Sequence, residues 1–344
     1  MSEIEQSWMD REAMESPGVV AGMLKSNSDA CRTLGGQLAD RYPPLVVTCA
    51  RGSSDHAATF AKYLFETQLG VLTASLGPSI SSVYKRRLRM EDALFLTISQ
   101  SGKSPDIVAS AKTAKECGAF VLALVNQQDS PLAEQADLSL PLLAGRERSV
   151  AATKSFIASL AAVLQLAACW SRDDGLLAAL DRLPDDLAAA ACLDWGEAIE
   201  PIANAGNMFV VGRGLGFGVA QEAALKFKET AELHAEAFSS AEVMHGPLAL
   251  VGEGFPVIAF TQDDQTREGM TGAIASMRDK GATVFAAEPG ETDPMRLPVV
   301  PDMHPACAPL AMILSFYRLA NRVALARGLD PDTPRHLRKV TETT

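Results

Sequence analysis

Three charged side chains lie at helical spacing in the segment QEAALKFKETA, residues 221–231. Glu222, Lys226 and Glu229 are four and three residues apart, so a helix places both carboxylates and the ammonium on one face. The residues between them are mostly alanine, leucine and phenylalanine. A carboxylate that is partly withdrawn from water has a raised pKa and can transfer a proton near neutral pH. The pattern indicates an acid–base site, and a solvent-exposed, ion-paired helix face is the alternative.

A second group of polar side chains follows the apolar run at residues 93–96. The stretch TISQSGKSPD, residues 97–106, surrounds one glycine with Ser99, Gln100, Ser101 and Ser104. Pro105 suits the first turn of a helix, where its missing N–H costs nothing. Free N–H groups, hydroxyls and the positive end of a helix dipole together bind phosphate. The loop therefore predicts a phosphate site, with a serine-rich helix cap as the alternative.

Two familiar nucleotide motifs are incomplete in this chain. Gly102-Lys103-Ser104 resembles the end of a P-loop, but Thr97 stands where the first glycine belongs. Gly212-x-Gly214 begins a dinucleotide turn, but its last glycine would fall at Phe217. Neither motif supports a nucleotide cofactor.

Composition narrows the function classes further. The chain has 344 residues and a formal net charge of -11, with dispersed lysines and arginines, which argues against a nucleic-acid partner. Its six cysteines form no C-x-x-C pair, so we expect reduced thiols and neither a zinc site nor another metal site. The acidic N-terminus lacks the apolar stretch of a signal peptide. The apolar run at 155–170 contains Gln165 and is too short to span a bilayer, so it predicts a buried helix. We expect a cytoplasmic protein without a membrane partner or a cofactor.

An internal duplication organises these elements. Residues 45–52 form an apolar run ending in Arg51-Gly52, and residues 208–214 repeat it, ending in Arg213-Gly214. Ser99-Gln100 then corresponds to Thr261-Gln262 at the same interval. In the second copy Asp263 and Asp264 replace the serines, and their charge would repel an anion. One copy is expected to have kept the site and the other to have lost it.

Each copy alternates short apolar strands with amphipathic helices, which predicts a parallel sheet covered on both faces. We predict an α/β protein of two flavodoxin-like subdomains related by duplication. The predicted parts are an N-terminal helical segment (1–34), a first domain with linking helices (35–195), a second domain (196–330) and a C-terminal tail (331–344). Ligands of open α/β sheets bind beyond the carboxyl ends of the strands. The turn at Arg51 and the loop at Ser99 should therefore lie together in one crevice.

Motifs spanning nearly the whole chain resemble the sugar isomerase (SIS) domain family. They are RGSS at 51–54, SQSGKS at 99–104, AGRERSVAATKSF at 144–156, QEAALKFKETAELHAEAFSSAEVMHGPLAL at 221–250 and DPDTPRHLRKVTETT at 330–344. The chain is similar to the isomerase half of glucosamine-6-phosphate synthase, and closer to stand-alone SIS-type glucosamine-6-phosphate deaminases. Ser2 follows Met1, so the cysteine nucleophile of a glutaminase half is not expected here.

The resemblance assigns roles to individual residues. It implies sugar-phosphate binding by Arg51, Gly52, Ser53, Ser54, Ser99, Gln100, Ser101, Ser104 and Val150. It implies that Glu229 moves a proton between C1 and C2 of the open-chain sugar, supported by Glu222 and Lys226. His245, in the turn Met244-His245-Gly246-Pro247, would assist ring opening from the neighbouring subunit of a homodimer. Lys339 would approach the open-chain carbonyl, either as an imine or to stabilise an oxyanion.

Two positions depart from the synthase pattern. Arg51 stands where the synthase has a cysteine, and Ala152 where it has a serine. Either change could alter which sugar is accepted.

The resulting expectation is conversion of glucosamine 6-phosphate to fructose 6-phosphate and ammonia, without a metal or a redox cofactor. One alternative is an isomerase of the synthase type that lacks the glutaminase half. Another is a non-catalytic sugar-phosphate sensor, although no basic recognition helix precedes the first strand. A different hexosamine or ketosamine phosphate is the third.

Overall fold

The computed structural model describes residues 6–290 and 295–339, and its chain divides into two compact units. The first unit comprises residues 18–146 and 155–181, and the second comprises residues 6–17, 147–154 and 182–339. Part of the predicted C-terminal tail, residues 340–344, lies outside the described residues.

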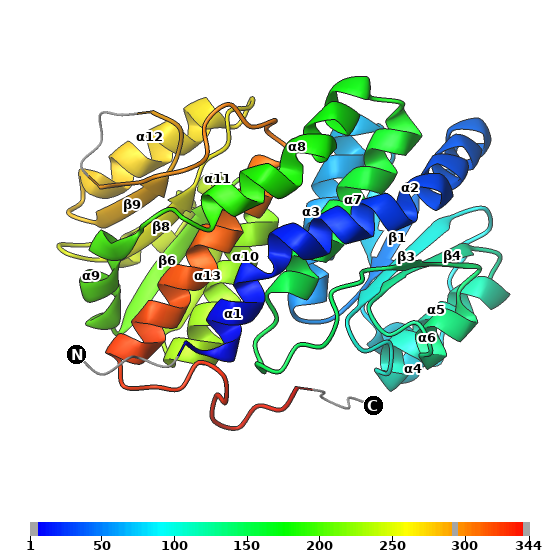
Figure 1. The fold of residues 1–344 in the computed structure, drawn as a ribbon, viewed down its shortest axis with the longest axis horizontal. Coiled ribbons are helices and arrows are strands. Elements are labelled where there is room, and N and C mark those ends of the chain that lie inside the picture. The colour runs from blue at the N-terminus through cyan, green and yellow to red at the C-terminus, as the bar shows by residue number, and fades with distance from the viewer. Residues whose placement is uncertain (1–5, 291–294, 340–344) are drawn as a thin grey trace. The chain divides into compact units, whose positions relative to one another are not determined.

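The first unit holds a five-stranded, entirely parallel sheet of order β2-β1-β3-β4-β5. This is the flavodoxin-like strand order. The strands are β1 (Val46–Cys49), β2 (Thr73–Ser75), β3 (Leu94–Ser99), β4 (Phe120–Val125) and β5 (Leu138–Pro141). The helices are α2 (Ser16–Arg41), α3 (Ser53–Gln68), α4 (Ser79–Ser82), α5 (Pro105–Glu116), α6 (Pro131–Gln135) and α7 (Lys154–Ser171). In Figure 1, α4, α5 and α6 gather on one side of this sheet, and α2, α3 and α7 on the other.

The second unit repeats the plan with the order β10-β9-β8-β6-β7. Its strands are β6 (Asn207–Gly212), β7 (His234–Ser239), β8 (Pro256–Phe260), β9 (Thr283–Ala287) and β10 (Arg296–Leu297), all parallel. Its helices are α1 (Trp8–Met14), the end of α8 (Asp174–Ala190), α9 (Ile199–Ala203), α10 (Leu215–Ala231), α11 (Ser240–Val243), α12 (Arg267–Arg278) and α13 (Ala308–Ala326), with short 3-10 turns at Gly196–Ala198 and Pro247–Leu250.

Alternating residues of β6 and β8 divide the second core into two faces. Phe209 and Val257 pack with Met270 and Ile274 of α12 on one face. Phe260 faces the other way, where its ring lies 6.1 Å from that of Phe316 on α13. The alternation follows from the two-residue period of a strand. It places α10 and α13 on the face opposite α12, so these two helices can share polar side chains.

The predicted fold class is confirmed. Read from β7, the second sheet has the same topology as the first, and the turns after the first strand of each copy also match. Gly52 (φ 54°, ψ -133°) and Gly214 (φ 58°, ψ -127°) begin α3 and α10 in nearly the same left-handed conformation, which glycine adopts without strain.

Helix α7 corresponds to the apolar run that predicts a buried helix. Within the described residues it is the one helix long and apolar enough to cross a membrane, and most of it is buried in the protein. Its partner α2 approaches it closely at Gly35, where an added Cβ would lie only 2.6 Å from the backbone carbon of Cys169. A glycine is therefore required at this helix crossing.

Candidate functional site

The loop after β3, residues 99–104, has an internally braced backbone that we call the serine loop. Ser99 Oγ accepts a hydrogen bond from Gly102 N (3.0 Å), and Ser101 Oγ accepts one from Lys103 N (3.3 Å). Ser104 is the residue before α5, but its side chain makes no capping hydrogen bond. Gly102 has a φ of 62°, and a Cβ there would lie 2.1 Å from Ser130 Oγ. The loop thus presents the N-terminus of α5 with an uncommitted hydroxyl, which suits an anion.

Arg51 connects the turn after β1 to the same place. Its Nε and Nη2 donate to one carboxylate oxygen of Asp106, at 3.0 and 2.6 Å. Asp106 is buried in the first turn of α5, whereas about half of the Arg51 side chain is exposed. Because β1 and β3 are neighbours, Gly52, Ser53 and Ser54 at the start of α3 lie beside the serine loop. The structure therefore brings together the two predicted parts of the phosphate site.

In the second unit, the loop that corresponds to the serine loop is occupied by the side chain of Gln262. Thr261 and Gln262 are completely buried. Gln262 Nε2 donates to Arg213 O (2.9 Å), to Asp264 Oδ2 (3.1 Å) and to Thr266 Oγ1 (3.2 Å). The glutamine amide lies between the two turns, and the loss of an anion site in this copy stays a prediction.

Glu222, Lys226 and Glu229 form a buried ionic cluster on α10, so the exposed-face alternative does not hold. The Lys226 side chain is fully buried, and its Nζ lies 3.3 Å from Glu222 Oε1 and contacts Glu229 Oε2. The Glu222 side chain is also fully buried, whereas 20% of the Glu229 side chain is exposed. Glu229 is thus the carboxylate of this cluster that a bound molecule can reach.

Tyr317 on α13 extends this cluster. Its hydroxyl donates to Glu222 Oε1 at 3.3 Å. Burial raises the pKa of Tyr317 well above its ordinary value, and the nearby negative charges of Glu222 and Glu147 raise it further. Burial alone would lower the pKa of Lys226, but Glu222 and Glu229 outweigh burial and raise it. Lys226 therefore remains an ammonium, and Tyr317 remains a hydrogen-bond donor.

The structure places Lys339 against residues 147–154 in the second unit. Lys339 Nζ donates to Ser149 O at 2.7 Å and to Glu147 Oε2 at 3.3 Å. Val150, predicted to bind substrate, donates its N–H to Asp332 O (3.1 Å). Its backbone therefore holds the part of the chain after α13, residues 327–339, which we call the C-terminal segment. His245 is exposed and follows α11 in a short turn.

Sequence reasoning missed Tyr317 and Glu147 as functional residues. Tyr317 lies in an apolar helix, where its ring has the same pattern as a core aromatic residue. Glu147 lies inside the AGRERSVAATKSF motif, and the signal available was that it is the one carboxylate of this motif, between Arg146 and Arg148. Among residues 6–290 and 295–339, no group of three or more histidine, cysteine, aspartate or glutamate side chains could hold a metal ion.

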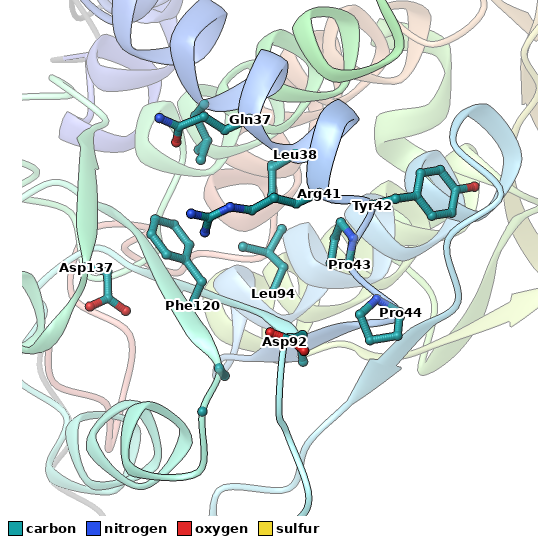
Figure 2. Close-up of a pocket in the computed structure, with 14 residues that line it drawn as sticks. Gln37, Leu38, Arg41, Tyr42, Pro43, Pro44, Asp92, Leu94, Phe120 and Asp137 are labelled. Carbon is teal, nitrogen blue, oxygen red and sulfur yellow. The ribbon is translucent and has the colours of Figure 1, made fainter.

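A hollow of about 890 Å³ lies at the other end of the first sheet. Its walls include Leu94 and Phe120, which are the first residues of β3 and β4. Figure 2 shows Arg41 reaching from the end of α2 toward Phe120. Ligands of open α/β sheets bind beyond the carboxyl ends of the strands. This hollow lies at the amino ends and is separate from the serine loop.

Fold and side chains together define a duplicated α/β protein of two doubly wound parallel sheets. The SIS domain family model matches residues 45–169 and 201–287, and the chain belongs to this family.

Curated sequence relatives are consistent with membership of the SIS family. The chain is 34% identical over 312 residues to a glutamine–fructose-6-phosphate aminotransferase (isomerizing) from Symbiobacterium thermophilum, covering 86% of this chain and 51% of that protein. The enzyme of the same name from Legionella pneumophila is also 34% identical, with 96% of this chain and 58% of that protein covered. The chain thus spans about half the length of the curated relatives it matches.

Solved structures agree on the fold. A candidate phosphosugar isomerase from Silicibacter pomeroyi is 46% identical with a TM-score of 0.90, over 95% of this chain and 100% of that one. The C-terminal domain of the aminotransferase from Francisella tularensis is 24% identical, with a TM-score of 0.86 over 97% and 100% of the two chains. A glucosamine-6-phosphate deaminase from Thermotoga maritima is 22% identical, with a TM-score of 0.80 over 98% and 100%.

Proposed function

We propose that this protein is a phosphosugar isomerase that deaminates glucosamine 6-phosphate to fructose 6-phosphate and ammonia. The observation that carries the proposal is the ionic cluster on α10. It contains two carboxylates and one ammonium, and only Glu229 of the three is partly exposed. A buried ion pair needs a specific reason, because desolvation of its charges cancels much of its attraction. Orientation of a reactive carboxylate is such a reason.

Glu229 acts as the base and then as the acid. It removes the proton from C2 of the open-chain amino aldose, giving an enolamine, and returns that proton to C1. A second proton passes from the nitrogen to O1, so C2 becomes an imine and C1 becomes a CH₂OH group. Water adds to the imine carbon and ammonia leaves, so one substrate and one water give one ketose and one ammonia. Lys226 and Glu222 hold Glu229 in place.

The serine loop is assigned to the phosphate. Backbone N–H groups and the Ser104 hydroxyl supply neutral donors, and Arg51, fixed by Asp106, supplies the nearby positive charge. Ser53 and Ser54 at the start of α3 complete the set. An acidic protein binds an anion through such local donors rather than through its overall field.

The ammonium of Lys339 supports the reaction at the carbonyl oxygen. It already donates to a backbone carbonyl and a carboxylate, so it is held as a donor and can steady the developing negative charge. An imine with the substrate carbonyl is the alternative use of this side chain.

His245 is assigned to ring opening in the site of a second copy of the chain. Its exposure on a turn supports this assignment. Mixing a Glu229→Gln variant with a His245→Ala variant should then restore part of the activity, because one site of each mixed dimer is intact. Activity that stays absent after mixing, with subunit exchange verified by mass, would exclude a shared site.

The named relatives favour a second candidate, a synthase-type isomerase that works with fructose 6-phosphate and ammonia. The chain is 34% identical to aminotransferases of this kind. The same proton transfer serves both directions, so the distinction lies in whether ammonia is released.

A panel of hexosamine 6-phosphates, assayed separately for ammonia and for ketose, tests the proposal. We expect equal amounts of both products from glucosamine 6-phosphate. Ketose without ammonia from a non-amino sugar phosphate would show simple isomerisation, and binding without any product would show a sensor.

The variant Glu229→Gln tests the assigned base. We expect kcat to fall by about 10²–10⁴-fold, the usual contribution of general acid–base catalysis, with substrate affinity little changed. Glu236→Gln is the matched control, because it makes the same change from carboxylate to carboxamide at an exposed position on β7. It should retain full activity. Normal turnover by Glu229→Gln would refute the assignment.

A further inference from the structure

Residues 147–154, which we call the 147–154 segment, bind the lysine of the C-terminal segment through a buried carboxylate. Glu147 Oε2 lies 3.3 Å from Lys339 Nζ, and the carbonyl oxygen of Ser149 accepts from the same Nζ at 2.7 Å. The Glu147 side chain is fully buried, whereas a quarter of the Lys339 side chain is exposed. Lys339 is thus bound by a buried carboxylate and a backbone carbonyl, while part of its side chain is exposed to solvent.

The Glu147 carboxylate is itself held at its other oxygen. Thr153 N donates to Glu147 Oε1 at 3.0 Å. With one oxygen on its own segment and the other on Lys339, the carboxylate has little freedom to turn. Its charge also contributes to the raised pKa of Tyr317, after burial and Glu222, so it lies close to the cluster on α10.

Helix α1 fixes the backbone of the same segment. The buried carboxylate of Glu12 accepts from Arg148 N and from Ser149 N (3.3 Å), which orients the Ser149 carbonyl. Burial raises the pKa of Glu12, and these backbone hydrogen bonds partly oppose the rise. The backbone of the 147–154 segment is therefore held by α1 independently of its contacts with Lys339.

Asp332 attaches the C-terminal segment to α1 as well. Its carboxylate accepts from Trp8 N (2.7 Å) and Met9 N (2.8 Å), and its carbonyl accepts from Val150 N. Figure 1 shows the C-terminal segment, in red, leaving α13 and running past α1. The path to Lys339 is thus anchored at two places.

We propose that Glu147 is a positioning residue that holds the Lys339 ammonium for turnover. An ammonium has three N–H donors, and Glu147 and Ser149 use two. The third is left for the substrate oxygen, in a direction that the first two determine. This inference rests on the proposed function for the part that Lys339 plays in the reaction.

The first arm of the test measures Lys339 without turnover. Acetylation of Lys339 is followed by mass spectrometry, with the exposed Lys62 as internal reference. Glu147→Gln keeps the shape and removes the charge, so Lys339 should react several-fold faster relative to Lys62. Glu232→Gln is the control, because Glu232 forms an exposed ion pair with Arg335 of the same C-terminal segment. It should leave the Lys339 rate unchanged.

The second arm measures kinetics. Glu147→Gln should lower kcat by about 10–100-fold, the range that misplacement of a catalytic group produces, and leave KM within about twofold, because the phosphate is bound elsewhere. Lys339→Met combined with Glu147→Gln should be no slower than Lys339→Met alone, since Glu147 acts through the lysine. Glu147→Asp keeps the charge on a shorter side chain. It should give intermediate values in both arms, and it is the second variant if the glutamine form does not fold.

An unchanged acetylation rate in both Glu147 variants would overturn the proposal whatever the activity. Faster acetylation with normal kcat would overturn it too, because Lys339 would then be displaced without effect. If the unaltered protein turns over no hexosamine phosphate, the proposed function fails, and the acetylation arm still decides whether Glu147 holds Lys339.

Discussion

At the scale of single residues, Lys226 explains why the acid–base cluster is stable. Its ammonium is fully buried and touches two carboxylates, so its charge is compensated without water. Its pKa is raised above the ordinary 10.5 because these carboxylates outweigh burial. The stability that this ammonium supplies is therefore complete below pH 10.5 and is lost only as the pH rises through the higher folded-state value.

Lys226→Met should destabilise the protein by about 3–5 kcal/mol, because it leaves the buried Glu222 carboxylate without its cation. Lys228→Met is the matched control on the same helix. Lys228 is exposed and donates to Ala235 O, so its loss should cost about 1 kcal/mol or less. Urea unfolding of both variants measures the difference. Equal losses would mean that the buried pairing contributes little.

The spacing of the α10 residues could be read from the sequence because four-and-three spacing has one meaning on a helix. What the sequence could not supply was their burial, which depends on α13 and its Tyr317 from almost a hundred positions away. Glu147 was missed for the same reason. Its role comes from Lys339, whose position depends on Asp332, Glu12 and the start of α1.

At the scale of elements, the crossing of α2 and α7 depends on one glycine. A Cβ at Gly35 would meet the backbone of α7 at 2.6 Å, and backbone atoms cannot move aside as a flexible side chain can. The adjacent Gly36 has open space around its Cβ position. The two neighbours therefore have opposite tolerance for the same methyl group.

Gly35→Ala should lower the free energy of unfolding by about 1–3 kcal/mol, because the helices must separate to accept the methyl group. Gly36→Ala should raise it by up to about 1 kcal/mol, since alanine is the better helix former. Thermal and urea unfolding of the pair check both signs. A gain at Gly35 would mean that the crossing is looser than the structure has it.

The central strands β1, β3, β4, β6, β8 and β9 were predictable from their apolar runs, and the repeated interval between Arg51 and Ser99 predicted that both sheets share one plan. Short elements were not predictable from the sequence. Strand β10 spans only Arg296–Leu297, too few residues to show any period. Its place follows from pairing with β9, which is a tertiary contact.

At the scale of the whole molecule, three buried thiols make stability depend on pH. Burial raises the pKa of Cys31, Cys49 and Cys307 to about 12. In the unfolded chain these thiols would ionise near their ordinary value of 9.0. The folded protein thus retains protons that the unfolded chain releases. Stability from this source is complete below pH 9 and is lost as the pH rises toward 12.

We expect the free energy of unfolding to fall above pH 9 by up to about 1.4 kcal/mol per pH unit for each of these thiols. Urea unfolding under reducing conditions at several values between pH 8 and 10.5 gives the slope. Replacing the three cysteines with alanine should make the slope shallower. Replacing the exposed Cys192 should leave it unchanged, and parallel slopes for all variants would contradict the assignment.

The burial of Gln262 in the second unit affects how many anions one chain can bind. A doubled fold could by symmetry take up two anions per polypeptide, but the buried Gln262 amide already donates to Arg213 O, Asp264 and Thr266 around the second turn. Under the proposed function, the two copies of the duplicated fold therefore have different roles. The first copy binds the phosphate ester, and the second copy carries the reactive helix α10.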